Sequence, residues 1–145
     1  MATTTASITL SSSDLLTDNL SLSATMNLYQ NGTTATGLDE MNYHRLVIPT
    51  GTAFDLIAES AALSEDASYV YIINKNTDVT DYVKISINAE EIGRLYAGDW
   101  LFMPWDCDLT AAANDSTIEI EAFTHEHIIE YALFHNGETL LTSGD

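Results

Sequence analysis

The chain has 145 residues, the length of a single domain, and its hydrophobic content of 46% is enough for a core of ordinary size. It contains 22 Asp and Glu residues but only four Lys and Arg residues, which gives a formal net charge of -18. Such a surface repels phosphate and has no cluster of basic residues, so we expect no nucleic-acid partner and no membrane partner.

The ends and the cysteine content add two further expectations. No apolar run approaches the roughly 20 residues that span a bilayer, and the N-terminus has neither a basic start nor an apolar stretch. We therefore expect neither a membrane span nor a signal peptide. Cys107 is the only cysteine, which excludes a disulfide within the chain and favours a small, half-buried hydrophobic residue.

The N-terminal part of the sequence predicts an arm followed by a strand. Residues 1–17 are rich in Thr and Ser, and the alternation of Ile8 and Leu10 suits an extended arm or an edge strand. From Leu20 to Leu28 apolar and polar residues alternate with a period of two, which predicts a strand with one buried face. Asn31-Gly32 and Gly37 then predict a turn or an exposed loop.

The rest of the chain reads as a series of short strands separated by turns. Tyr69 to Asn74 is apolar on both faces, as expected of a central strand. The other expected strands are Tyr43–Ile48, Phe54–Ile57, Tyr82–Ile87 with its hairpin partner Glu91–Leu95, Trp100–Met103, Ile118–Glu121 and Ile128–Phe134. We therefore predict an all-β fold, an antiparallel β-sandwich or jelly roll of eight or nine strands, over residues 18–136 with a polar tail over 137–145.

Two groups of side chains suggest a metal site. His125 and His127 lie two residues apart, so on a strand both imidazoles would meet one ion, as in the H-x-H pair of cupins. The order of motifs is the reverse of that family's, and a third ligand such as His44 would have to converge. Asp106 and Asp108 are the alternative, as loop carboxylates of the kind that bind Ca²⁺. In both cases we favour solvated side chains, and we expect no cofactor and no metal.

The sequence offers little support for catalysis. No Gly-x-Ser-x-Gly motif or glycine-rich phosphate loop is present, and the aspartates on either side of Cys107 would suppress its thiolate. We therefore expect no catalytic residues and a protein that is not an enzyme.

Large aromatic residues gather after the Ala97–Asp99 turn. For Trp100, Phe102 and Trp105 we favour burial in the core, although Trp105, past the proline, is the one best placed to reach a surface. There it would anchor a subunit contact or stack on a sugar. The residues expected in an interface are accordingly Trp105, Tyr96, Ile8 and Leu10.

Several segments carry a resemblance to a known class of protein: LSLSATMNLYQNGTTATGL, YVYIINKNTD, EIGRLYAGDWLFMPWD and IIEYALFHNG. In style and order they resemble small β-rich structural proteins of tailed bacteriophages, over roughly residues 7–137. The resemblance implies a capsid decoration (cement) subunit, located in the virion after assembly in the host cytoplasm. It implies the major capsid protein or another virion protein as partner, and a homotrimer or homodimer.

Three other functions remain open at this stage. A tail or neck accessory protein is a variant of the decoration hypothesis. A glycan-binding host-attachment module would use Trp105 or Tyr96 with acidic loop residues. A cupin-like metal protein would use the two histidines named above.

Overall fold

The alternating segments form β-strands throughout the part of the chain that the structure describes. This computed structural model describes residues 3–15, 20–29, 37–38, 40–57, 67–105 and 117–135. Within these ranges there are ten strands, all paired in antiparallel sheets, and no helix. None of the described segments is therefore a helix that could cross a membrane. The prediction of an all-β fold is confirmed.

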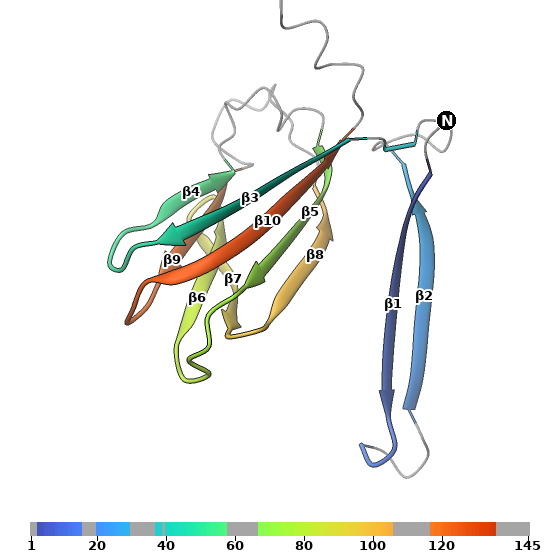
Figure 1. The fold of residues 1–145 in the computed structure, drawn as a ribbon, viewed down its shortest axis with the longest axis horizontal. Helices are drawn as coiled ribbons and strands as arrows, with labels where there is room; N and C mark the ends of the chain where they lie inside the picture. The colour runs from blue at the N-terminus through green and yellow to red at the C-terminus, as the bar shows by residue number, and fades with distance from the viewer. Residues whose placement is uncertain are drawn as a thin grey trace, which may run out of the picture.

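Eight of the strands form two four-stranded sheets that face each other (Figure 1). The first sheet has the order β3 (Glu40–Ile48), β10 (His127–His135), β5 (Ala67–Asn74) and β8 (Trp100–Pro104). The second has the order β4 (Phe54–Ile57), β9 (Ile118–Ala122), β6 (Tyr82–Ile87) and β7 (Glu90–Tyr96).

The strand pairs are nested, which identifies the topology. β6 pairs with β7, β5 with β8, β4 with β9 and β3 with β10, so in the sequence each pair flanks the pair named before it. A long hairpin rolled up in this way gives the two sheets of an eight-stranded jelly roll. Of the two predicted architectures, the strand order therefore matches the jelly roll.

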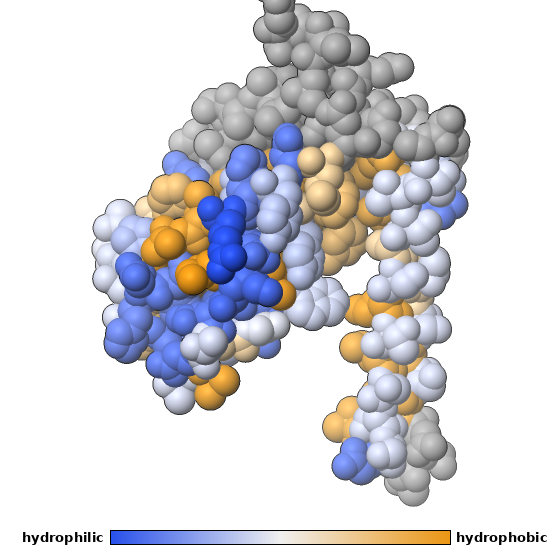
Figure 2. Space-filling model, in the orientation of Figure 1, coloured by the Kyte–Doolittle hydropathy of each residue, from blue (hydrophilic) through white to orange (hydrophobic). Residues whose placement is uncertain are grey.

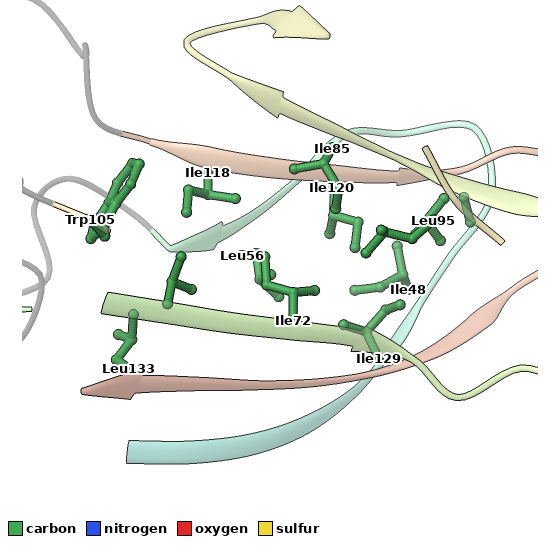
Figure 3. Packing of buried hydrophobic residues seen from close by; sticks show 13 residues of the cluster. Ile48, Leu56, Ile72, Ile85, Leu95, Trp105, Ile118, Ile120, Ile129 and Leu133 are labelled. Atoms are coloured by element: carbon green, nitrogen blue, oxygen red, sulfur yellow. The ribbon is translucent and has the colours of Figure 1, made fainter. Parts of the chain in front are cut away.

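The core lies between the two sheets and consists of aliphatic side chains from both. Figure 3 shows Ile72 and Ile129 of the first sheet pointing toward Ile120 and Leu56 of the second. Each of the four is at most 5% exposed, and burial of one such side chain stabilises the fold by about 1.5–3 kcal/mol. The alternation in these strands, apolar at every second residue, is what brings the side chains together.

The two remaining strands form a separate hairpin. β1 (Thr4–Ser12) pairs with β2 (Leu20–Leu28) in its own sheet, and the hairpin projects away from the sandwich (Figure 1). The expectation that Leu20–Leu28 buries one face is wrong, because β2 pairs only with β1 and most of its side chains are exposed. The expected domain boundary at residues 17–18 falls between the two strands of this hairpin.

Candidate functional site

The β1–β2 hairpin has two chemically different faces, and the sequence alternation sets them. The register places Ala6 opposite Met26, Ile8 opposite Ala24, and Leu10 opposite Leu22. Because side chains alternate across a strand, these six share one face, which we call the apolar hairpin face. Ile8 is 43% exposed and Leu22 54% exposed, so this face is largely open to solvent.

The opposite face of the hairpin consists of hydroxyl and amide side chains. Ser7 and Thr25 are joined by a hydrogen bond between their hydroxyl groups at 3.0 Å, and the Thr5 hydroxyl donates to Asn27 Oδ1 at 3.2 Å. Neither strand contains a charged residue, in a chain whose net charge is -18. The two strands are thus uncharged, with one wet and one apolar side, and the acidic residues Asp14 and Asp18 belong to the segment that joins them.

Among the described residues, the hairpin packs on the sandwich at its base. Leu28 and Leu38 are buried against Tyr69 of β5, with Phe102 and Phe134 packed around them. The Thr4 hydroxyl, at the start of β1, donates a hydrogen bond to the carbonyl oxygen of Leu38 at 2.8 Å. The contact fixes where the hairpin leaves the sandwich.

The outer face of the first sheet carries a row of aromatic rings beside the hairpin. The register aligns Tyr69 with Pro104, Tyr71 with Phe102, and Ile73 with Trp100. The ring centroids of Tyr69 and Phe102 are 5.5 Å apart, and those of Tyr71 and Trp100 are 6.5 Å apart. Such spacings are those of interacting rings, so the row is a continuous aromatic surface.

A groove separates the apolar hairpin face from this aromatic row. It has a volume of about 430 Å³, and its walls are almost entirely apolar. The residues that line it are Ala6, Ser7, Ile8, Ala24, Met26, Tyr71, Trp100 and Phe102. Figure 2 shows apolar side chains along the side of the hairpin that faces the sandwich. Trp100, at 49% exposure, is half open to solvent.

A second feature is a buried polar cluster around Asp81, at the start of β6. Asp81 is 3% exposed, and its Oδ1 accepts hydrogen bonds from the backbone N–H groups of Tyr82 and Thr124. Its Oδ2 accepts the N–H of His125 at 2.8 Å and lies 3.1 Å from Nδ1 of the same residue. One carboxylate therefore holds the loop between β9 and β10 against β6.

His127, the first residue of β10, also belongs to this cluster. Its Nε2 lies 3.2 Å from Asp81 Oδ2, and its Nδ1 lies 3.1 Å from Nδ2 of Asn76. The Asn76 Oδ1 accepts the N–H of Thr77, which directs the Asn76 amide NH₂ toward His127. Nδ1 is then the acceptor and Nε2 carries the imidazole proton, facing Asp81. Because His127 is 0% exposed, no substrate reaches this ring.

The electrostatics of the cluster favour ionised Asp81. Burial raises the pKa of the Asp81 carboxyl, but hydrogen bonds from the N–H groups of Tyr82 and His125 and from the His125 side chain, together with the nearby His127 ring, outweigh it. The net result is a pKa well below the ordinary aspartate value. The cluster thus stabilises a charge in the folded chain and provides no open coordination position.

The predicted metal ligands are placed by the structure as follows. His125 and His127 do come together, but on a carboxylate rather than on an open site, and only His127 lies in a strand. His44 is on β3, where its ring stacks on Tyr131 at 5.2 Å. Among the described residues, no group of three or more His, Cys, Asp or Glu is arranged to hold a metal ion. Asp106 and Asp108 lie outside the described residues, as does Cys107.

The predicted interface residues divide between the surface and the core. Ile8, Leu10 and Tyr96 are exposed, at 43%, 50% and 40%. Trp105 is 6% exposed and belongs to the core cluster, as the favoured alternative of burial expects. A surface contact through Trp105 is therefore a wrong expectation, because the indole is packed among apolar side chains between the sheets (Figure 3).

Tyr96 belongs to a smaller aromatic group on the second sheet. The Tyr82 ring lies 4.7 Å from the Phe123 ring and 5.3 Å from the Tyr96 ring, and the Arg94 guanidinium lies 4.7 Å above Tyr82. Phe123 is 59% exposed. This group was not predicted as a unit, because Phe123 is far from the other members in the sequence and only the β6–β9 pairing brings it near Tyr82.

Comparison of the chain with protein-family models gave no match, and the search of curated proteins gave none either.

Proposed function

We propose that the protein is a non-enzymatic structural subunit of a virion, a capsid decoration subunit that stabilises the shell by binding across its outer surface. The observation that carries the proposal is the projecting hairpin with its exposed apolar face, since large exposed apolar surfaces mark sites of protein contact. The virion setting comes from the sequence resemblance to structural proteins of tailed bacteriophages.

The chemistry of the surfaces supports this role. The acidic surface of the sandwich keeps particles apart and repels nucleic acid. The uncharged strands of the hairpin, by contrast, approach an acidic neighbour with little repulsion between like charges. A subunit of this kind binds through an extended arm and keeps its charged body in solvent.

A binding experiment tests the proposal. Virions of the phage whose genome encodes the chain are purified and analysed by mass spectrometry, and we expect many copies per particle. Shells stripped of the chain are then mixed with purified protein and sedimented. We expect wild-type protein to sediment with the shells, and Ile8→Thr with Leu10→Thr to bind at least about tenfold more weakly, because about 2 kcal/mol of apolar contact is lost.

The matched control lies on the opposite face of the same hairpin. Ser11→Thr with Ser23→Thr adds the same strand-favouring residue type where the hairpin is wet, and this variant is expected to bind like wild type. Absence of the chain from virions contradicts the proposal, and so does equal binding of both double variants.

The aromatic group of Tyr82, Tyr96 and Phe123 favours a second candidate, a glycan-binding host-attachment module. Exposed rings on a sheet surface stack on sugar faces, and Tyr96 was among the residues expected to do so. A glycan array probed with the purified protein tests this function. Binding that is lost in Phe123→Ala supports it, and an array without hits removes it.

A further inference from the structure

The groove between the apolar hairpin face and the aromatic row is lined on both sides by side chains that favour removal from water. Met26, on one wall, is 48% exposed, and Trp100, on the other, is 49% exposed. A two-stranded hairpin is marginally stable in water by itself, and in the described part of the chain this one packs on the sandwich at its base. Both walls therefore have the properties of a contact surface.

We propose that a second copy of this chain occupies the groove, by an exchange in which each hairpin lies with its apolar face on the aromatic row of the other copy. The proposal rests on the assembly role proposed above and deepens it: the exchanged dimer is the unit that binds the shell, so Ile8→Thr with Leu10→Thr weakens shell binding by weakening the dimer. It is tested on the purified chain alone, so its failure is distinguishable from failure of the virion role, which is tested on particles.

The distribution of charge favours the binding of a second copy in the groove. Two molecules of net charge -18 repel each other over most of their surface. The strands of the hairpin carry no charge, and on the outer face of the first sheet Arg45 lies 3.7 Å from Glu130 of the neighbouring strand, an ion pair without net charge. Hairpin and sheet face are thus two surfaces that meet without strong repulsion.

The contact at the base of the hairpin shows that the two surfaces fit. There Leu28, which lies on the same side of β2 as Met26, is buried to 2% exposure against Tyr69, in the same row of rings. Ala6 and Phe102 belong to this contact and also line the groove, so the groove continues an existing interface. Farther from the base, the side chains of the apolar hairpin face, such as Ile8 and Leu22, are exposed.

The area available is sufficient for a weak but specific dimer. A strand of nine residues is about 30 Å long and a pair of strands is about 10 Å wide, so one hairpin face covers about 300 Å². Reciprocal docking of two hairpins on two sheets buries about 1,200 Å² in total, the lower end of the range for specific interfaces. Because each chain supplies both halves of the contact, a two-fold arrangement closes and uses both.

Cross-linking between two differently tagged copies tests the proposal. In a Cys107→Ser background, one copy carries Ala24→Cys on the apolar hairpin face, and the other carries Tyr71→Cys in the aromatic row together with a mass tag. The copies are mixed, unfolded, refolded together and oxidised. We expect a disulfide-linked product with the summed mass of the two, and light scattering of the untagged wild type that gives twice the 15.9 kDa of one chain.

The control moves the hairpin cysteine by one residue. Ser23→Cys lies on the wet face of β2, and we expect it to give less than a tenth of the cross-linked product with the same partner. Trp100→Cys replaces Tyr71→Cys if the latter does not fold. Equal yields from Ala24→Cys and Ser23→Cys overturn the proposal. So does a wild-type chain that remains monomeric, a double variant with both Ala24→Cys and Tyr71→Cys that links only within one molecule, or a groove that binds only an apolar dye or a foreign protein.

Discussion

A single buried carboxylate joins three segments of this chain. Asp81 accepts backbone N–H groups of Tyr82, Thr124 and His125 and lies next to the ring of His127. Its pKa is well below the ordinary value because these donors outweigh the effect of burial. The cluster of His125, His127 and Asp81, whose histidines suggested a metal site, therefore joins β6 to the β9–β10 loop.

Replacement of this carboxylate is expected to lower stability and to change its pH dependence. A carboxyl whose pKa falls on folding stabilises fully above its unfolded value of about 4, and this contribution is lost as the pH falls below that value. Asp81→Asn should reduce the free energy of unfolding at pH 7 by about 1.5–3 kcal/mol, and the difference from wild type should shrink between about pH 4 and pH 2. Urea unfolding over this pH range measures both effects.

The control for Asp81 is Glu126→Gln, one residue from His125 on the exposed loop. It removes one acidic charge from the same region and is expected to change the free energy of unfolding by less than about 0.5 kcal/mol. If the difference between Asp81→Asn and wild type does not vary with pH, the ionised carboxylate is not the source of the stability.

At the scale of elements, the β6–β7 hairpin contains a strained turn. Asn88 and Ala89 are its two loop residues, with φ values of 51° and 64°, in the left-handed region. Two positive φ values in a two-residue loop indicate a type I′ turn, in which the second position favours glycine. Asn suits the left-handed conformation, whereas alanine costs about 1–2 kcal/mol there.

Ala89→Gly should therefore stabilise the protein. The relief of strain exceeds the entropy that glycine adds to the unfolded chain, and a net gain of about 0.5–1 kcal/mol is expected in chemical denaturation. Ala97→Gly, in the next turn, is the matched control, because Ala97 has no positive φ. It should destabilise by about 0.4–1 kcal/mol. Equal signs for the two substitutions would contradict this explanation.

The individual strands show which parts of the fold could be predicted from the sequence. The alternation of Ile118 and Ile120 with glutamates, and the apolar run around Ile72, identified strands because period and composition act locally. Leu20–Leu28 shows the limit: alternation separates an apolar face from a polar face, but it does not say what covers the apolar one. Asp81 had no signal at all, since, apart from its neighbour Tyr82, its donors come from residues more than 40 positions away.

For the molecule as a whole, charge opposes both folding and association. Of the 22 acidic residues, Asp14 and Asp18 fall between β1 and β2 in the sequence, 20 follow β2, and the two strands carry none. The functional proposal depends on this contrast: the body of the subunit remains solvated and repels its neighbours, and the uncharged strands of the hairpin make the contact.

Salt should accordingly stabilise the protein. Raising NaCl from 0.05 to 0.5 M shortens the screening length from above 10 Å to about 4 Å, which weakens repulsion among the carboxylates. We expect a higher thermal unfolding midpoint and a larger associated fraction. KCl at equal ionic strength should give the same shift, because screening does not depend on the identity of the monovalent cation. A midpoint that falls with added salt would show that attractive ion pairs outweigh the repulsion.

The central claim is that the β1–β2 hairpin is the element through which the chain joins an assembly, and amide hydrogen exchange tests it most directly. Exchange is measured by mass spectrometry in dilute protein and again in the assembled state. We expect amides of β1 and β2 to exchange quickly in dilute protein and to become protected on assembly, whereas β5 and β10 in the centre of the first sheet are protected in both. Equal protection of the hairpin in the two states would contradict the account.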